Sequence, residues 1–211
     1  MTIYFIRHGE SLANEKDLFL GHGDLDLTKK GYEQAKKTAE FLRDQPIDVI
    51  YSSDLQRAFH TAQPTAGIKG LPIIKEKGFR EIDAGEWDFK PFSELKTKYK
   101  KTYDLWRDDY ENAHCDGGES VAEMLDRILE TLRKVIDKHP NKNIAIFMHA
   151  TPIRCLASYF KGNGVAGTKD VPWANNASVT IVDFTDGKFN LIEYGKDDFM
   201  RDLSTGLPED L

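Results

Sequence analysis

The stretch "IYFIRHGESLAN" (residues 3–14) places an arginine and a histidine directly after a run of apolar, β-forming residues. Such a short run is typical of a buried strand, here predicted over Thr2–Ile6. In an open parallel sheet, ligands bind beyond the carboxyl ends of the strands, where the loops diverge. We therefore expect Arg7 and His8 to lie at a ligand-binding edge, with Gly9 allowing the backbone to turn sharply and approach an anion.

The rest of the chain alternates apolar runs with amphipathic helical patterns. Further strands are predicted over Ile47–Tyr51 and Asn143–Met148, and helices over Gly31–Arg43, Asp54–Ala66, Glu119–Lys138 and Pro152–Phe160. This order is typical of βαβ units. We predict an α/β fold with three α/β/α layers, a mainly parallel central sheet and a single domain over residues 1–211.

Local signals add detail to this fold. Thr28 and Ser53 each precede a helical pattern and are predicted to cap it, and Pro152 suits a first helical turn. Near the end of the chain, two apolar runs over 178–184 and 188–194 flank Thr-Asp-Gly, residues 185–187. This arrangement predicts a hairpin at one edge of the sheet.

Residues 82–118 do not fit the alternation. They combine many charges with seven aromatic residues, and we interpret them as a lid or cap inserted into the α/β unit. Within this segment, "KTKYKKTY" (residues 96–103) is cationic in an otherwise acidic protein. Two interpretations stay open: it guides an anionic substrate, or it is a solvated helix face whose aromatic side chains pack inward.

Composition excludes several functional classes. The 211 residues carry a net charge of -6, which argues against nucleic acid as the main partner. No apolar segment approaches the length of a membrane span, and the N-terminal run is too short for a signal peptide, so we expect a cytoplasmic protein with no membrane partner. Cys115 and Cys155 lack the spacing of a zinc or redox motif, and no residue pattern demands a metal.

Two further candidate side chains follow predicted strands. Arg57 lies in "YSSDLQRAFHTA", and His149 lies in "MHATPIR". With Arg7 and His8 they make a plausible pocket for a tetrahedral dianion, because arginine binds phosphate in a planar fork and histidine serves as donor or nucleophile near neutral pH. A leaving alkoxide needs a proton, which "FREIDAGEW" offers through a carboxyl group at position 81, 83 or 86.

Six blocks of the sequence, in order, resemble the motifs of the histidine phosphatase superfamily, the phosphoglycerate mutase-like group. They are "FIRHGESLAN", "LDLTKKGYEQA", "IYSSDLQRAFHTA", "FREIDAGEWDF", "GGES" and "FMHATPIRCLAS", and the resemblance runs from residue 3 to about residue 182. The resemblance implies that His8 becomes phosphorylated, that Arg7, Arg57 and His149 stabilise the transferring group, and that Glu81 protonates the leaving group. It implies no metal and no cofactor.

The same resemblance suggests the residues that bind substrate, which are Arg7, Asn14, Gly21, His22, Arg57 and Ala150. Asn14 matches an asparagine that holds a phosphate oxygen, and Gly21 and His22 lie in a loop that the family places near substrate. Two positions depart from the common pattern. Ala150 follows the second histidine where many relatives have glycine, and Phe89 stands where glycine is common in phosphatase-like members.

Three functions remain open from the sequence. The leading hypothesis is a histidine acid phosphatase-type phosphomonoesterase that transfers phosphate from a small phosphorylated metabolite through phospho-His8 to water, without a metal. The second is a cofactor-dependent phosphoglycerate mutase, which returns phosphate to a second hydroxyl. The third is a non-catalytic module that binds a phosphorylated ligand. The physiological substrate and the oligomeric state do not follow from the sequence.

Overall fold

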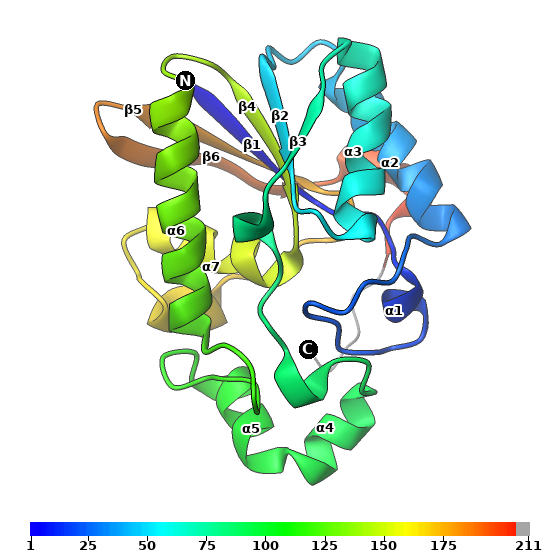
Figure 1. Cartoon of the computed structure of the whole chain (residues 1–211), viewed down its shortest axis with the longest axis vertical. Coiled ribbons are helices and arrows are strands. Elements are labelled where there is room, and N and C mark those ends of the chain that lie inside the picture. Colours follow the sequence, from blue (N-terminus) through cyan, green and yellow to red (C-terminus); the bar gives the residue numbers. More distant parts are fainter. Residues whose placement is uncertain (206–211) are drawn as a thin grey trace.

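The computed structural model describes residues 1–205, which build one six-stranded sheet in the order β3-β2-β4-β1-β5-β6 (Figure 1). Its strands are β1 (Thr2–Arg7), β2 (Val49–Ser52), β3 (Ile73–Lys75), β4 (Ile144–Met148), β5 (Val179–Thr185) and β6 (Lys188–Lys196). The first four are parallel, and β5 and β6 are antiparallel additions beside β1. The predicted α/β class with a mainly parallel sheet is confirmed.

Helices cover both faces of this sheet (Figure 1). The helices α2 (Lys29–Leu42) and α3 (Gln56–Lys69) cover one face, and α6 (Val121–Lys138) and α7 (Ala150–Phe160) cover the other. Alternate residues of β1 point to opposite sides, since Tyr4 and Ile6 belong to one buried cluster while Ile3 and Phe5 belong to the other. A strand buried on both faces explains the continuous apolar run in the sequence.

The predicted hairpin is present at the sheet edge. Strands β5 and β6 pair from Thr185 and Lys188 outward, and Asp186 and Gly187 form the two-residue turn, both with positive φ. This backbone geometry is the one that favours glycine and aspartate in tight hairpins. The short strand β3, at the other edge, was not predicted, because three residues are too few to show a periodicity.

Two of the three predicted helix-end signals fit the structure. The Thr28 side chain accepts a hydrogen bond from the Gly31 amide and caps α2, and Pro152 lies in the first turn of α7. The prediction for Ser53 was wrong, since α3 begins after Leu55 without a side-chain cap. The Ser53 hydroxyl contacts a histidine on the loop after β4 instead.

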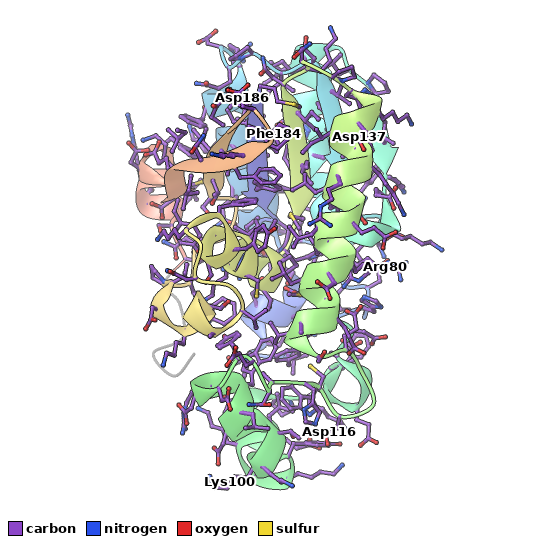
Figure 2. All side chains as sticks on the ribbon, turned by 90° about the vertical axis from the view of Figure 1, so that its left-hand side faces the viewer. Arg80, Lys100, Asp116, Asp137, Phe184 and Asp186 are labelled. Carbon is purple, nitrogen blue, oxygen red and sulfur yellow. The ribbon has the colours of Figure 1, made fainter. Side chains whose placement is uncertain are left out.

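The chain between β3 and α6 forms four short helices. The first, η1 (Lys77–Phe79), contacts α6. The other three, η2 (Gly85–Trp87), α4 (Phe92–Lys98) and α5 (Lys100–Asp108), lie together at one end of the molecule (Figures 1 and 2). Their aromatic side chains pack inward, with Trp87, Tyr103 and Trp106 buried. Lys98 and Lys100 pair with carboxylates of the same helices, which favours the interpretation of the lysine-rich segment as a solvated face.

Three shorter elements complete the described chain: α1 (Leu12–Glu15), η3 (Ala166–Asp170) and η4 (Asp198–Leu203). Within residues 1–205, no helix combines the length and the apolar character needed to cross a membrane. Cys115 and Cys155 are both buried and unpaired.

Candidate functional site

The two predicted histidines meet at the carboxyl ends of adjacent strands. Strands β1 and β4 run parallel with Arg7 opposite Met148, so His8 and His149 follow at the same level of the sheet. The His8 amide donates to the Met148 carbonyl over 3.0 Å, and the two imidazole centroids lie 5.3 Å apart. Residues 141 positions apart are thereby brought side by side, as the strand pattern predicted.

His8 is held as a neutral imidazole. Its side chain is 5% exposed, and its Nδ1 lies 2.7 Å from the Gly9 carbonyl, which assigns the proton to Nδ1 and leaves Nε2 with a free lone pair. Burial lowers the pKa of His8 well below 6.5, and the positive charges of Arg57 and Arg7 lower it further. A neutral imidazole with an available Nε2 is the form that a nucleophilic histidine requires.

His149 is fully buried and oriented by one hydroxyl. Its Nε2 lies 2.9 Å from Ser53 Oγ, and its Nδ1 has no hydrogen-bond partner among the described residues. Burial and the positive charge of Arg57 lower the pKa of His149 well below 6.5. If the Ser53 hydroxyl donates to Nε2, the proton of His149 lies on Nδ1 as a free donor.

Two arginines supply buried positive charge beside these rings. Arg7 ends β1 and donates from Nη1 to the Ala174 carbonyl, while Arg57, in the first turn of α3, donates to the carbonyls of Gly21 and Gly23. Burial lowers the pKa of each guanidinium to about 10, so both remain charged at neutral pH. Arg7 Nε is buried without a partner among residues 1–205. Unsatisfied buried donors of this kind favour binding of an anion.

Glu81 is the buried carboxyl group of the site. It is 6% exposed, and its two oxygens accept hydrogen bonds from the amides of Ile82 and Thr151. Burial raises its pKa above the usual value, against the opposing effect of those two amides. The two other carboxyl groups considered from the sequence differ: Asp83 is half-buried and Glu86 is exposed. Among the three carboxyl groups, Glu81 is therefore the one whose burial favours the protonated form.

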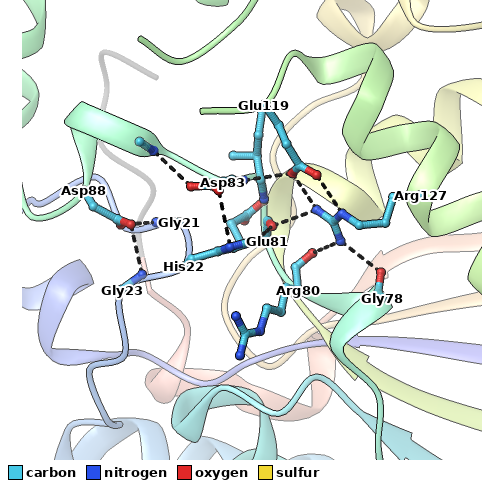
Figure 3. A network of polar contacts seen from close by, with 12 residues as sticks. Gly21, His22, Gly23, Gly78, Arg80, Glu81, Asp83, Asp88, Glu119 and Arg127 are labelled. Atoms are coloured by element: carbon cyan, nitrogen blue, oxygen red, sulfur yellow. Dashed lines mark hydrogen bonds and ion pairs between the residues drawn. The ribbon is translucent and has the colours of Figure 1, made fainter. Parts of the chain in front are cut away.

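A polar network holds the backbone of Glu81 in place (Figure 3). Arg127 of α6 forms a two-point ion pair with Glu119 and donates from the same guanidinium to the carbonyls of Gly78, Arg80 and Glu81. The ring of His22 lies against the Glu81 carbonyl at 3.1 Å. These contacts fix the segment that carries the carboxyl group, and sequence spacing gave no sign of them.

The glycine after His8 has a different role from the one expected. A Cβ atom on Gly9 would lie 2.5 Å from the Gly31 carbonyl oxygen, and its φ is not positive. Gly9 is therefore required because the loop packs directly on the start of α2. Its amide donates to Thr61 Oγ1 rather than into the pocket.

Asn14 is tied to the loop after β1 by two side chains. Its Oδ1 accepts from the backbone amide and the hydroxyl of Ser11 and from Asn176 Nδ2, and Asn14 lines the pocket. Asn176 also donates to the His8 carbonyl at 3.2 Å. The sequence analysis missed Asn176, because it lies just before β5 in a loop without periodicity or a recognised motif.

One pocket contains most of these groups. Its charged end includes Arg7, His8, Arg57 and Glu81, and Asn14, Ala150, Thr151 and Asn176 also line it. Gly21, His22 and His149 are not among its lining residues. The Gly21 carbonyl accepts from Arg57. The Gly21 amide donates to the Asp88 carboxylate, and the His22 ring contacts the Glu81 carbonyl (Figure 3). Over residues 1–205, no three His, Cys, Asp or Glu side chains gather in a way that could hold a metal ion.

Comparison with known proteins links this arrangement to a family. The sequence model of the histidine phosphatase superfamily (branch 1) matches residues 3–197. Phosphoserine phosphatase 1 of Hydrogenobacter thermophilus is 34% identical over 156 residues, covering 74% of each chain. Phosphoglycerate mutase-like protein 4 of Arabidopsis thaliana is 34% identical, covering 73% of this chain and 68% of its own. The solved structure of Bacillus stearothermophilus YhfR superimposes with a TM-score of 0.90 at 27% identity, covering 94% of this chain and 98% of that one.

Proposed function

The chain belongs to the histidine phosphatase superfamily, as a phosphatase or mutase-type enzyme, and on that premise we propose that it hydrolyses phosphate monoesters through a phosphohistidine at His8. The substrate is a small phosphorylated metabolite, and the reaction needs no metal. Arg7, Arg57 and His149 bind and stabilise the phosphoryl group, Asn14 holds one of its oxygens, and Glu81 transfers the proton.

The observation that carries this proposal is the pairing of two neutral, buried histidines in complementary states. His8 has a free lone pair at Nε2, while His149 has an unpartnered Nδ1. Two buried, charged arginines lie beside them. A nucleophile, a neutral donor and fixed positive charge are the groups that phosphoryl transfer to nitrogen needs.

In the first step, the Nε2 lone pair of His8 attacks phosphorus and the bond from phosphorus to the ester oxygen breaks. The proton of Glu81 goes to the departing oxygen, so an alcohol leaves and Glu81 becomes a carboxylate. The equatorial phosphoryl oxygens are stabilised by Arg7, Arg57 and the Nδ1–H of His149. Fixed donors of this type act on charge as it develops, without reorganisation.

In the second step, water attacks the phosphorus of phospho-His8. The Glu81 carboxylate takes one proton from that water, the bond between phosphorus and Nε2 breaks, and its electrons return to the ring. Inorganic phosphate leaves, and both Glu81 and His8 recover their starting forms. The raised pKa of Glu81 supports this double role, because a group that holds its proton readily can also take one up.

A mutase remains the second candidate because one relative is named as phosphoglycerate mutase-like. In that reaction, phospho-His8 would return the phosphoryl group to a second hydroxyl of the substrate instead of to water. The same two histidines and Glu81 would serve both reactions. The two reactions would differ in which acceptor the rest of the pocket holds beside phospho-His8: water in the hydrolase, or a second hydroxyl of the substrate in the mutase.

The test is turnover by the EDTA-treated protein of p-nitrophenyl phosphate and of 3-phosphoglycerate, with released phosphate and isomerised product measured together. We expect phosphate release, and an acid-labile protein phosphate that is absent from His8→Ala. Isomerisation that greatly exceeds release would establish the mutase instead. Tight binding of phosphate without turnover of any ester would establish a binding module, and unchanged turnover by His8→Ala would overturn the role of His8.

A further inference from the structure

We infer that the substrate is the phosphate ester of an uncharged, mainly apolar alcohol, aromatic rather than small and polar, with no second anionic group. This inference rests on the proposed function and concerns the part of the same pocket that receives the alcohol. It distinguishes the chain from enzymes whose substrates carry a carboxylate beside the phosphate.

The first argument is the distribution of positive charge. Among the described residues that line the pocket, only Arg7 and Arg57 are permanently cationic, and both lie at the phosphoryl end with His8. The remaining charged lining residues are acidic: Glu10, Asp17 and Glu81. A carboxylate on the alcohol would have no cation to pair with there, and a partly desolvated, unpaired charge is costly.

The rim of the pocket reinforces this charge selection. Asp17 is exposed, and its carboxylate makes no ion pair within residues 1–205. Glu10 is half-buried and lies 3.7 Å from the Lys30 ammonium, while also accepting from the Thr28 hydroxyl. A second anion on the substrate would meet like charge at this rim, whereas a neutral group would not.

The second argument is the apolar part of the pocket lining, here called the wall. It consists of six apolar side chains from four segments: Leu18, Phe19, Leu20, Phe92, Trp106 and Trp173. Phe19 packs edge-on against both Trp106 and Phe92, with ring centroids 5.3 and 5.8 Å away. An aromatic wall fixed by its own packing is preorganised to receive a flat apolar group.

A third buried arginine, Arg154, adds no positive charge to the pocket lining. Arg154 of α7 donates to the Val171 carbonyl and to the Tyr110 hydroxyl, and its guanidinium lies 4.3 Å from the centroid of the Trp173 ring. It is not among the lining residues. Its donors are used by protein groups, so it holds Trp173 in place as part of the wall rather than binding a second anion.

The test uses three esters that share an alkyl leaving group: ethyl phosphate, 2-phenylethyl phosphate and 2-(4-carboxyphenyl)ethyl phosphate. We expect kcat/KM for the phenyl compound to exceed that for ethyl phosphate by about ten- to a hundred-fold, the value of burying one ring. The carboxylate should lower kcat/KM by about ten-fold relative to the phenyl compound, since an unpaired charge costs at least that much.

Two variants and one control test whether the wall causes the preference. Trp173→Ala should reduce the phenyl-to-ethyl ratio several-fold, while Tyr159→Ala, which removes an exposed ring of α7 outside the pocket, should not. Leu18→Arg should raise the ratio of carboxyphenyl to phenyl turnover. Each ratio is measured within one protein sample, so a fraction that fails to fold cancels.

The outcomes separate the two proposals. Efficient turnover of the esters with the carboxylate as good as, or better than, the phenyl compound would overturn the substrate class and leave the hydrolase intact. Equal turnover of ethyl and phenylethyl phosphate would do the same. No turnover of any of the three, or of p-nitrophenyl phosphate, would overturn the hydrolase and the substrate class with it.

Discussion

The imidazole centroids of His8 and His149 lie 5.3 Å apart, with the ring planes at 60°, and each residue directly follows one of two adjacent parallel strands. Their hydrogen bonds orient them differently: a backbone carbonyl holds Nδ1 of His8, and the Ser53 hydroxyl holds Nε2 of His149. Each ring therefore has a different nitrogen available. This division fits the separate tasks that we propose for the two side chains at one phosphoryl group, with His8 as nucleophile and His149 as donor.

Glu81→Gln should slow turnover according to the leaving group. The variant keeps the size of the side chain and removes the proton that the departing oxygen requires, so kcat for an alkyl phosphate should fall by about 10²–10⁴-fold. For p-nitrophenyl phosphate, whose leaving group is stable as an anion, the first step should change far less. The measurement is kcat for both esters, with formation of the phosphoenzyme followed separately.

Glu86→Gln is the matched control, because it alters an exposed carboxylate on the same segment. We expect kcat for both esters to stay within about two-fold of the unmodified protein, as is usual for a surface substitution. If Glu86→Gln shows the dependence on leaving group and Glu81→Gln does not, the acid has been assigned to the wrong residue.

Ser53→Ala should lower kcat with little change in KM. The variant removes the hydroxyl that orients His149, which leaves the ring free to place its proton on either nitrogen. Loss of one such hydrogen bond corresponds to about a ten-fold decrease in rate. The distinguishing readout is the nitrogen NMR spectrum of His149, in which Ser53→Ala should change the tautomer. A lower kcat with an unchanged tautomer would contradict this role.

Gly9→Ala should destabilise the fold by about 1–3 kcal/mol, because the new methyl group would meet the Gly31 backbone and force the loop apart. Gly67→Ala is the matched control. It lies in α3 with no atom within 4 Å of its added Cβ, so it should stabilise by about 0.5–1 kcal/mol. Urea unfolding of both variants measures the free-energy difference, and equal effects would argue against the packing explanation for Gly9.

The sequence predicted the part of the site that the strands position. Arg7, His8 and His149 follow apolar runs, and parallel strands bring their carboxyl ends together whatever their separation along the chain. Arg57 follows for the same reason at the start of α3. These side chains converge because each follows a strand of a mainly parallel sheet, and both the strands and the parallel arrangement were predicted from the sequence.

Side chains that act on other side chains were not predictable in this way. Serine is a residue type that often caps helices, and Ser53 precedes a helical pattern. Its hydroxyl instead contacts His149, because β2 and β4 are neighbours in the sheet. Asn176 reaches His8 from a loop whose course no periodicity predicts, and Arg154 of α7 contacts Trp173, which is remote from it in the fold's helix and strand pattern. Their roles depend on three-dimensional distance alone.

The two buried histidines should also make the protein less stable in acid. Both have a pKa well below 6.5 in the folded state, because burial and neighbouring arginines oppose their protonation. Below pH 6.5 the unfolded chain therefore binds more protons than the folded chain, and the free energy of unfolding falls as the pH falls. Glu81 acts in the opposite sense, since its raised pKa favours the folded state at lower pH.

A comparison with one variant isolates the histidine contribution from that of Glu81. Between pH 7.5 and 5.5, each histidine should account for a loss of about 1.4 kcal/mol of unfolding free energy. His149→Gln cannot titrate, so its unfolding free energy should fall by about 1.4 kcal/mol less over this interval than that of the unmodified protein, even if the variant is less stable at every pH. Urea unfolding at both pH values measures the difference. Equal pH dependence in both proteins would mean that folding does not lower the pKa of His149, which would contradict the effect of its burial.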